Sequence, residues 1–292
     1  MIPQKRKHPL DAAPLGKGMT DTDFSRLSRL VYSTCGIRLA PVKKTMLEGR
    51  LRKRLKTLGI DSFRGYCEYL ATEEGMRAEC IPMLDAVTTN KTDFFREPKH
   101  FEFLLKVALP ELERLGAVGK RAARVWSAGC SSGEEPYTLA MVLSEYGREH
   151  PGFRFTVLGT DISTRVLESA RKATYRDELV DPVDIELRKR YLLKSKDKKL
   201  HLVRMGPEIR SAVTFRRLNF MDSDYGIGKP MHMIFCRNVL IYFDRETQEE
   251  VIRKFYRCLA PGGYLFVGHS ETVQNMDLPL VPAAASVYRK AP

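Results

Sequence analysis

Residues 125–136, with the sequence VWSAGCSSGEEP, are the part of the chain best suited to chemistry. The first two residues favour a buried strand, the two glycines allow tight turns and the close approach of a ligand, and the proline suits the first turn of a helix. A strand, a glycine loop and a helix in this order open many α/β nucleotide sites. The segment therefore predicts a ligand at the loop between Gly129 and Gly133.

The residues of this loop favour a nucleoside that carries no phosphate. The spacing Gly-x-x-x-Gly lacks the third glycine of a dinucleotide-binding loop, and no Gly-Lys-Ser/Thr follows as in a P-loop. Glu134 and Glu135 at the helix start would repel a phosphate and can bind a cation or hydroxyl groups. S-adenosylmethionine, with its sulfonium, ammonium and ribose hydroxyls, fits these residues. A structural turn with a solvated acidic cap is the alternative, and the loop alone supports both.

Polar residues also follow the later predicted strands, where a doubly wound sheet binds ligands outside the carboxyl ends of its strands. Asp161 ends the second predicted strand, where a ribose-binding acid is expected. Asn219 could contact an adenine edge, and Arg237 and Asn238 end a later strand. Asp161 could equally be a helix cap and Asn219 a turn residue, but the order of these residues along the chain indicates one site.

Strands that alternate with helices after residue 92 predict the sheet that holds these residues. The expected strands lie at about 124–127, 155–159, 213–218, 231–236, 264–267 and 285–289. Such alternation favours a mostly parallel, doubly wound α/β sheet. A charged turn at 194–199 lies between two apolar stretches and predicts an inserted hairpin subdomain at about 188–214.

The chain before this sheet predicts a small all-α domain over residues 20–92. A helix capped near Asp21, a second helix opened by Pro41 and ended by Gly59, and two further apolar helical segments support this prediction. Residues 1–19 are rich in Lys, Arg, Pro and Gly without periodicity, and we expect them to form a mobile basic tail.

The second predicted helix carries a strongly basic face, to which Arg50, Lys53 and Arg54 belong. A solvated helix usually mixes charges of both signs, whereas this one has a single acid. The face is either a docking surface for an acidic helix or for phosphates, or merely a soluble basic surface.

The composition excludes several classes of protein. No apolar run in the 292 residues is as long as a membrane span, so we expect a cytoplasmic protein without membrane insertion. The six cysteines are scattered and the histidines form no metal-binding motif, so we expect neither disulfides nor a bound metal. The net charge of +13 favours an acidic partner without identifying it.

Several blocks of the chain resemble those of the CheR family of chemotaxis receptor methyltransferases, which are S-adenosylmethionine-dependent protein-glutamate O-methyltransferases. The blocks lie at 89–96, 126–137, 159–162, 215–219, 235–243 and 259–264. The resemblance covers about residues 20–290, and the blocks TNKTDFFR and CRNVLIYF are the most specific.

The resemblance implies a Rossmann-like methyltransferase sheet with an inserted small β-hairpin subdomain over residues 93–292, preceded by the all-α domain. The residues that would line the cofactor site are Asn90, Thr92, Arg96, Glu134, Asp161, Asn219, Phe220, Arg237 and Asn238. Arg96 and Tyr242 would lie nearest the transferred methyl group. The basic helix would face the methylation helices of the receptor, and the β-subdomain binds a receptor C-terminal peptide in some members.

The implied reaction needs no general base. A receptor glutamate, already ionised near pH 7, would attack the sulfonium methyl in line and give a methyl ester and S-adenosylhomocysteine. Catalysis should come mainly from holding the two reactants in line. We expect Arg96 to orient the carboxylate or the cofactor and Tyr242 to position one of them, with a purely cofactor-orienting role of Arg96 as the alternative.

Three other functions fit parts of the sequence. A nucleic-acid methyltransferase agrees with the positive charge, but the strings NPPY and Pro-Cys of such enzymes do not occur. A small-molecule carboxyl methyltransferase would not need the basic helical domain. A non-catalytic adaptor that senses S-adenosylmethionine would bind the cofactor without transferring methyl. We expect a monomer that acts on receptor helices and binds no nucleic acid.

Overall fold

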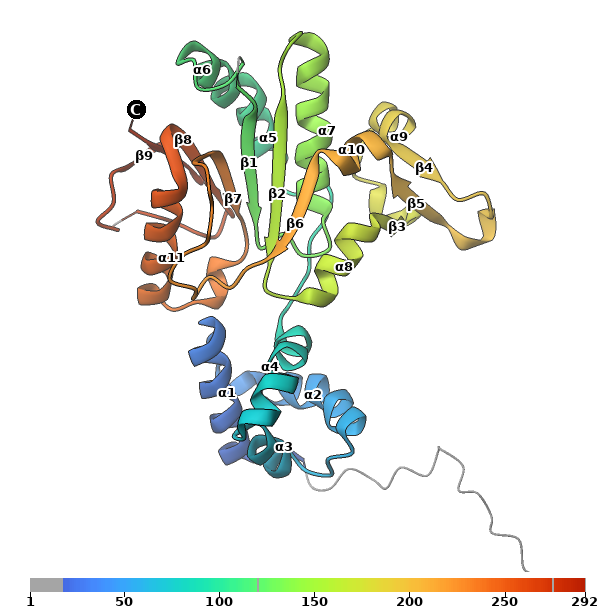
Figure 1. The fold of residues 1–292 in the computed structure, drawn as a ribbon, viewed down its shortest axis with the longest axis vertical. Coiled ribbons are helices and arrows are strands. Elements are labelled where there is room, and N and C mark those ends of the chain that lie inside the picture. The colour runs from blue at the N-terminus through green and yellow to red at the C-terminus, as the bar shows by residue number, and fades with distance from the viewer. Residues whose placement is uncertain (1–17, 120, 275, 292) are drawn as a thin grey trace, which may run out of the picture. The chain divides into compact units, whose positions relative to one another are not determined.

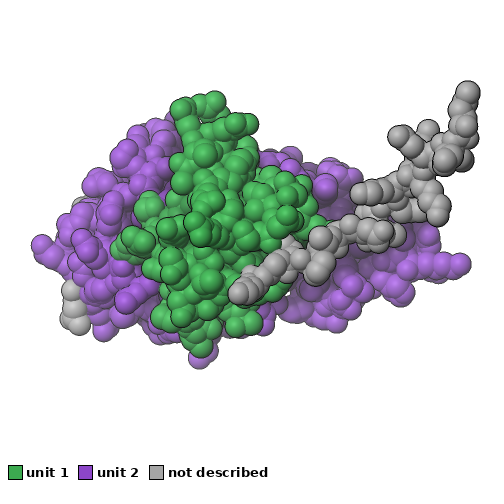
Figure 2. Space-filling model, turned by 90° about the horizontal axis from the view of Figure 1, so that it is seen from below, with its two compact units in different colours: residues 1–33, 39–88 green, residues 34–38, 89–292 purple. Residues whose placement is uncertain are grey.

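The structure is a computed structural model, drawn as a ribbon in Figure 1, that describes residues 18–119, 121–274 and 276–291. The chain divides into two compact units, which are coloured separately in Figure 2. The first unit comprises residues 1–33 and 39–88, and the second comprises residues 34–38 and 89–292. The short segment 34–38 therefore belongs to the second unit, although the sequence places it within the all-α domain.

The predicted tail, residues 1–19, lies outside the described residues except at its end. There Met19 is buried, and its amide donates to Glu48 Oε2 at 3.2 Å. The prediction of a mobile tail is therefore wrong for Met19, because a buried side chain and a long-range hydrogen bond hold the chain just before helix α1 (Asp21–Cys35).

The first unit is built from α-helices, as the sequence predicts. After α1 come the 3₁₀ turn η1 (Pro41–Lys43), α2 (Lys44–Leu58), α3 (Phe63–Leu70) and α4 (Glu73–Val87). Leu47, Leu51 and Leu55 are buried on one face of α2, because residues four apart lie on the same side of a helix. Ser62 and Thr72 cap α3 and α4 by accepting from the backbone amide three residues further on.

A seven-stranded sheet with the order β6–β2–β1–β7–β8–β10–β9 forms the centre of the second unit. Its strands are β1 (Ala123–Ala128), β2 (Phe155–Asp161), β6 (Val213–Arg217), β7 (Met231–Cys236), β8 (Leu259–Val267), β9 (Leu280–Ala284) and β10 (Val287–Lys290). The strands from β6 to β8 run parallel, and β10 runs antiparallel to both of its neighbours. The predicted mostly parallel α/β sheet is confirmed, with β9 as an additional edge strand.

Helices cover both faces of this sheet (Figure 1). The helices of this unit are α5 (Lys99–Phe103), α6 (Leu109–Arg114), α7 (Glu134–Glu149), α8 (Thr164–Lys172), α9 (Ile185–Tyr191), α10 (Pro207–Ser211) and α11 (Arg245–Cys258). Of these, α9 lies beside the inserted small sheet rather than on the central one. The π-helical turn η2 (Leu104–Ala108) joins α5 to α6. No helix within the described residues is long and apolar enough to cross a membrane.

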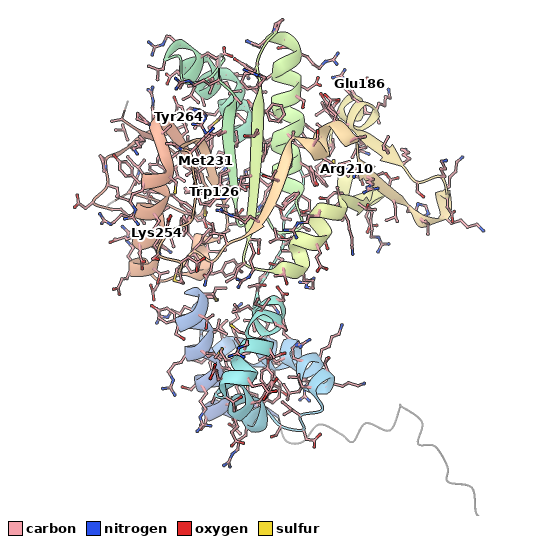
Figure 3. All side chains as sticks on the ribbon, in the orientation of Figure 1. Trp126, Glu186, Arg210, Met231, Lys254 and Tyr264 are labelled. Carbon is pink, nitrogen blue, oxygen red and sulfur yellow. The ribbon has the colours of Figure 1, made fainter. Side chains whose placement is uncertain are left out.

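Alternate residues of the central strands pack on opposite faces of the sheet. Val125 and Phe235 belong to one apolar cluster, together with α7, whereas Trp126 and Ile234 belong to the other, together with α11. Successive side chains of a strand point to opposite faces, so continuous apolar runs mark a sheet buried on both sides. Trp126, labelled in Figure 3, packs edge-on against Phe255 at a centroid distance of 5.1 Å.

A separate three-stranded sheet lies between α8 and β6 in the chain. The strands β4 (Leu192–Lys194) and β5 (Leu202–Met205) form the predicted hairpin, and β3 (Thr174–Arg176) pairs with the other side of β5. The predicted subdomain boundary at residue 188 is therefore wrong, because its sheet already begins at β3. A strand of three residues is too short for an alternating pattern to reveal it.

Candidate functional site

The shape of the loop from Gly129 to Gly133 requires its glycines. Their φ angles are 83° and 99°, in the left-handed region that disfavours side chains. A Cβ atom at Gly129 would lie 2.5 Å from Val239 Cγ2, and one at Gly133 would lie 2.9 Å from Tyr175 Oη. The loop connects β1 to α7, as the sequence predicts.

Asp161, at the end of β2, fixes this loop. Its Oδ2 accepts from Ser131 N at 2.9 Å, and its Oδ1 accepts from Ser163 N at 2.9 Å. Ser163, and not Asp161, caps α8 by accepting from Val166 N. Because each carboxylate oxygen can accept more than one hydrogen bond, Asp161 can hold the loop and still accept from a ligand hydroxyl.

The segment that follows residue 89 runs beside the glycine loop. It carries the predicted site residues Asn90, Thr92 and Arg96. The Asn90 carbonyl accepts from Ser131 Oγ at 2.8 Å, and Phe95 N donates to Thr138 Oγ1 of α7 at 3.2 Å. The Arg96 side chain is half-buried, with Nη1 donating to Lys91 O at a long 3.4 Å, so it can be drawn to a ligand.

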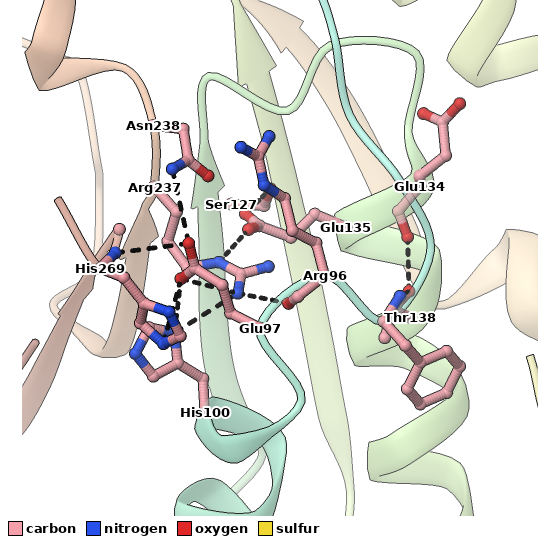
Figure 4. Close-up of polar contacts among 12 residues, drawn as sticks. Arg96, Glu97, His100, Ser127, Glu134, Glu135, Thr138, Arg237, Asn238 and His269 are labelled. Carbon is pink, nitrogen blue, oxygen red and sulfur yellow. Dashed lines mark hydrogen bonds and ion pairs between the residues drawn. The ribbon is translucent and has the colours of Figure 1, made fainter. Parts of the chain in front are cut away.

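The neighbouring acids Glu134 and Glu135 point in different directions (Figure 4). Glu135 accepts from Ser127 Oγ and from Arg237 Nε, each at 2.6 Å. Glu134 accepts instead from Ser132 Oγ at 2.8 Å, and burial raises the pKa of its carboxyl to about 7. Glu134 forms no ion pair within the described residues, so a cationic ligand would compensate its buried charge.

Protein groups enclose the Arg237 side chain, which leaves it little room for the predicted contact with a cofactor. The side chain is 2% exposed. Its Nη1 donates to Arg96 O and its Nε to Glu135 Oε2, each at 2.6 Å. The Phe101 and Phe235 rings lie 5.3 and 5.9 Å from the guanidinium carbon. The Arg237 side chain is thus bound by protein groups on several sides.

The Asn219 side chain also forms its hydrogen bonds within the protein. Its Nδ2 donates to Thr34 O at 2.6 Å, and its Oδ1 accepts from Met221 N at 3.1 Å. Asn219 thus acts as a turn residue, which is the alternative that the sequence left open beside contact with an adenine edge. The next residue, Phe220, is buried and packs against Phe255 at 5.3 Å.

Asn238 and Tyr242 lie on the loop that follows β7. Asn238 adopts a φ of 59°, and its Nδ2 donates to Glu97 Oε1 at 3.4 Å. Its buried Oδ1 has no hydrogen-bond partner among the described residues, so it is open to a ligand donor. Tyr242 ends the 3₁₀ turn η5 (Leu240–Tyr242), and its carbonyl accepts from Arg38 N at 2.9 Å.

Two acids that sequence reasoning missed, Glu97 and Glu271, join the loops of the site. Glu271 Oε2 accepts from Gly268 N at 2.6 Å and from Asn238 N at 2.9 Å, and burial raises the pKa of its carboxyl. Glu97 Oε1 accepts from Asn238 and from His269 N, the latter at 3.3 Å. Glu97 directly follows the TDFFR block, which is the one available signal; no pattern marks Glu271.

The acceptors of this site fit S-adenosylmethionine better than a phosphate-bearing nucleotide. The Glu134 carboxylate, Asp161 and the unpaired Oδ1 of Asn238 offer oxygens to an ammonium, a sulfonium or ribose hydroxyls. The same carboxylates would repel a phosphate at the start of α7, although helix N-termini otherwise attract anions.

The structure separates the three residues predicted to dock a partner. Lys53 is exposed on α2. Arg54 donates through Nε and Nη2 to the two oxygens of the buried Glu79, each at 2.7 Å, and Arg50 donates to Val87 O. Arg54 is therefore part of a core ion pair rather than a free surface charge.

One group of described residues, Glu97, His100 and His269, has the composition of a metal site. Arg237 Nη1 lies 3.3 Å from His100 Nδ1 and 3.6 Å from Glu97 Oε2. Burial, together with the nearby Arg237, lowers the pKa of His100 to about 4, so the neutral ring can accept from the guanidinium. The Arg237 guanidinium thus places a positive charge beside two of these three groups.

Comparisons with known proteins agree with this architecture. Residues 22–88 match the model of the CheR methyltransferase all-alpha domain, and residues 90–287 match that of the CheR methyltransferase SAM binding domain. The chain is 39% identical over 280 residues to the chemotaxis protein methyltransferase of Borreliella burgdorferi, covering 94% of this chain and 96% of the relative. It is 39% identical to that of Salmonella typhimurium (88% and 86% covered) and 38% identical to that of Escherichia coli (92% and 91% covered).

The two matched domains correspond to the two units of the structure. The all-alpha match lies mostly in the first unit, and the SAM binding match lies in the second. The relatives are similar over most of their own length, so the match is not confined to the nucleotide-binding part. The chain belongs to the CheR methyltransferase family, whose members join an all-α domain to a domain that binds S-adenosylmethionine.

Proposed function

We propose that this protein methylates glutamate side chains of chemotaxis receptors in the cytoplasm, giving glutamate methyl esters and S-adenosylhomocysteine. The observation that carries the proposal is a CheR-family site with a buried carboxylate, Glu134, that forms no ion pair among the described residues and could bind a cationic nucleoside. The relatives named above are chemotaxis protein methyltransferases, which supports the same reaction here. A glutamate nucleophile is already ionised at neutral pH, so the reaction does not depend on a general base.

The residues proposed to line the cofactor site are Asn90, Thr92, Arg96, Glu134, Asp161, Asn219, Phe220, Arg237 and Asn238. The structure suggests a division of work among them. Glu134, Asp161 and Asn238 present acceptors to the ligand, whereas Asn219 and Arg237 shape the surrounding loops. S-adenosylmethionine supplies the methyl group when it is bound.

Arg96 and Tyr242 are proposed to align the receptor carboxylate with the methyl group. Among the described residues the Arg96 guanidinium makes only a long hydrogen bond, to Lys91 O, so it can turn to a carboxylate, whose geometry its planar fork matches. Tyr242 lies on the loop that also carries Asn238, so it can contribute its hydroxyl to the same site. Holding reactants in line in this way can supply most of the rate enhancement.

The proposed receptor-docking surface is the exposed part of the basic face of α2, with Lys53 and Lys56. These two residues lie three apart and so share one side of the helix. Their charges suit the acidic surface of a helix that presents glutamates. Arg54 supports this surface indirectly through its ion pair with Glu79.

The test is transfer of labelled methyl from S-adenosylmethionine to membranes that contain the chemoreceptors of the same organism. We expect label on the receptor that mild base releases as methanol, because a carboxyl ester hydrolyses and a methylated amine does not. Receptors with their methylatable glutamates changed to alanine serve as the control. Base-stable label, or label on nucleic acid, would contradict the proposed acceptor. Cofactor binding without any transfer would support a sensing adaptor instead.

A further inference from the structure

The backbone on either side of Arg96 is strained. Phe95 has a φ of 53° and Glu97 a φ of 56°, a left-handed conformation that bulky side chains rarely adopt. Such residues persist only where the surrounding structure fixes them, and they gather at functional sites. The strain therefore raises the question of what holds Arg96 in place.

Contacts from three parts of the fold hold this strained segment. The amide of Phe95 donates to Thr138 Oγ1 of α7 at 3.2 Å. The carbonyl of Arg96 accepts from Arg237 Nη1 at 2.6 Å. The carboxylate of Glu97 accepts from the loops that follow β7 and β8. The contact from Arg237 acts on the backbone of Arg96 itself.

Arg237 is in turn fixed by the protein (Figure 4). Glu135 Oε2 accepts from its Nε at 2.6 Å, while Glu135 Oε1 accepts from Ser127 Oγ at 2.6 Å. The neutral His100 ring lies 3.3 Å from Nη1. A guanidinium can reach Glu135 and the Arg96 carbonyl at once because its donors form a rigid planar fork, which a lysine ammonium lacks.

We propose that Arg237, anchored by Glu135, is a positioning residue that fixes the backbone of Arg96 and thereby directs the Arg96 side chain at the reacting groups. The inference rests on the proposed function, in which Arg96 aligns the reactants. It adds different roles for the two neighbouring acids at the start of α7. Glu135 acts inside the protein, through Arg237 and Arg96, whereas Glu134 faces the ligand. Neither Arg237 nor Glu135 needs to touch the cofactor through its side chain.

The first test needs no turnover and measures amide hydrogen exchange of the full-length protein. Arg237→Lys and Glu135→Gln should each speed exchange in the peptide that covers residues 92–98 by about tenfold or more, the range of local opening. Arg188→Lys is the matched control, because the Arg188 guanidinium also holds backbone carbonyls, those of Val183 at 2.7 Å and Asp181 at 2.6 Å. It should leave the peptide unchanged.

Unchanged exchange in this peptide, in variants that remain folded, would overturn the proposal. If Arg237→Lys fails to fold, the milder Glu135→Gln variant decides, because glutamine keeps the size of the side chain but removes the charge that anchors the guanidinium.

The second test is a double-mutant cycle on receptor methylation. Arg237→Lys should lower kcat by about ten- to a hundredfold, the cost of misplacing a reacting group, while changing the Kd for S-adenosylhomocysteine by less than about threefold. In a protein that already carries Arg96→Ala, adding Arg237→Lys should lower kcat by less than about threefold further, because the effect of Arg237 passes through Arg96.

Equal losses in both backgrounds, or a rise in Kd that matches the loss in rate, would mean that Arg237 acts directly on the ligand. Absence of methyl transfer by the wild-type protein would instead contradict the proposed function. In that case the exchange experiment still decides whether Arg237 positions the Arg96 backbone.

Discussion

At the scale of single residues, the ionisation of Glu134 should control cofactor binding. Burial raises the pKa of its carboxyl to about 7 in the free protein, and a bound cation favours the carboxylate and lowers that pKa. Affinity should therefore be full above pH 7 and fall as the pH drops below it. We expect the Kd for S-adenosylmethionine, measured by calorimetry, to rise about tenfold from pH 8 to pH 6.

Glu134→Gln is the control for this titration. The variant should bind more weakly at pH 8 and lose most of the dependence on pH, because glutamine does not ionise. An equally steep dependence in the variant would assign the titration to another group, on the ligand or on the protein.

The sequence indicates the class of ligand at this scale but not which side chains face it. Glu134 and Glu135 are neighbours in one motif, yet adjacent residues of a helix point about 100° apart, so one meets the ligand and the other the core. Asn219 and Arg237 are bound by Thr34 and Glu135, from distant parts of the chain. Only the folded structure brings these partners together.

At the scale of elements, the segment Thr34–Arg38 links two loops of the site. Its first residue accepts from the Asn219 side chain at 2.6 Å, and the amide of its last residue donates to Tyr242 O at 2.9 Å. Between them, Gly36 has a φ of 74°. Most long strands and helices of both units follow from local patterns, whereas the short strand β3 and the edge strand β9 do not. Nothing in the sequence indicates that residues from the end of α1 would belong to the methyltransferase unit.

We predict that Gly36→Ala impairs the site. An added Cβ would lie 2.8 Å from Met221 Sδ and 3.0 Å from Thr247 Cγ2, so the segment or its neighbours must shift. The left-handed backbone adds a cost of about 1–2 kcal/mol in stability. We expect the rate of methyl transfer to fall by about three- to tenfold, because a displacement of about 1 Å at the reacting groups can cost up to about a hundredfold and this shift is expected to be smaller.

Gly116→Ala separates crowding from backbone strain. Gly116 has a similar φ of 68°, but nothing lies within 4 Å of the position of its Cβ. This variant should lose a comparable amount of stability in a denaturant titration while keeping its rate of methyl transfer. Equal rates in the two variants would show that the segment Thr34–Arg38 does not support the site.

At the scale of the whole molecule, action on a protein substrate requires a docking surface besides the site, and the net charge of +13 makes an acidic partner favourable. The sequence predicts the basic face of α2, but it does not show which of these charges a partner can reach. Arg54, for example, forms an ion pair with the buried Glu79. Arg54 is thus a poor probe of docking, because its removal would leave the buried Glu79 with Tyr66 Oη but without its cationic partner and would destabilise the fold.

Lys53→Glu/Lys56→Glu is the sharper probe, since both residues are exposed. Reversing the two charges should lower methylation at subsaturating receptor by about tenfold, equivalent to about 1.4 kcal/mol, and leave the calorimetric Kd for S-adenosylhomocysteine unchanged. Added salt should reduce the wild-type rate toward that of the variant, because screening weakens exposed charges.

Lys106→Glu/Lys229→Glu makes the same change in net charge on exposed residues of the other unit and should have little effect. Equal losses of methylation in the two double variants would mean that only the net charge matters and would contradict docking on α2. A loss confined to the Lys53/Lys56 variant assigns receptor docking to the all-α unit.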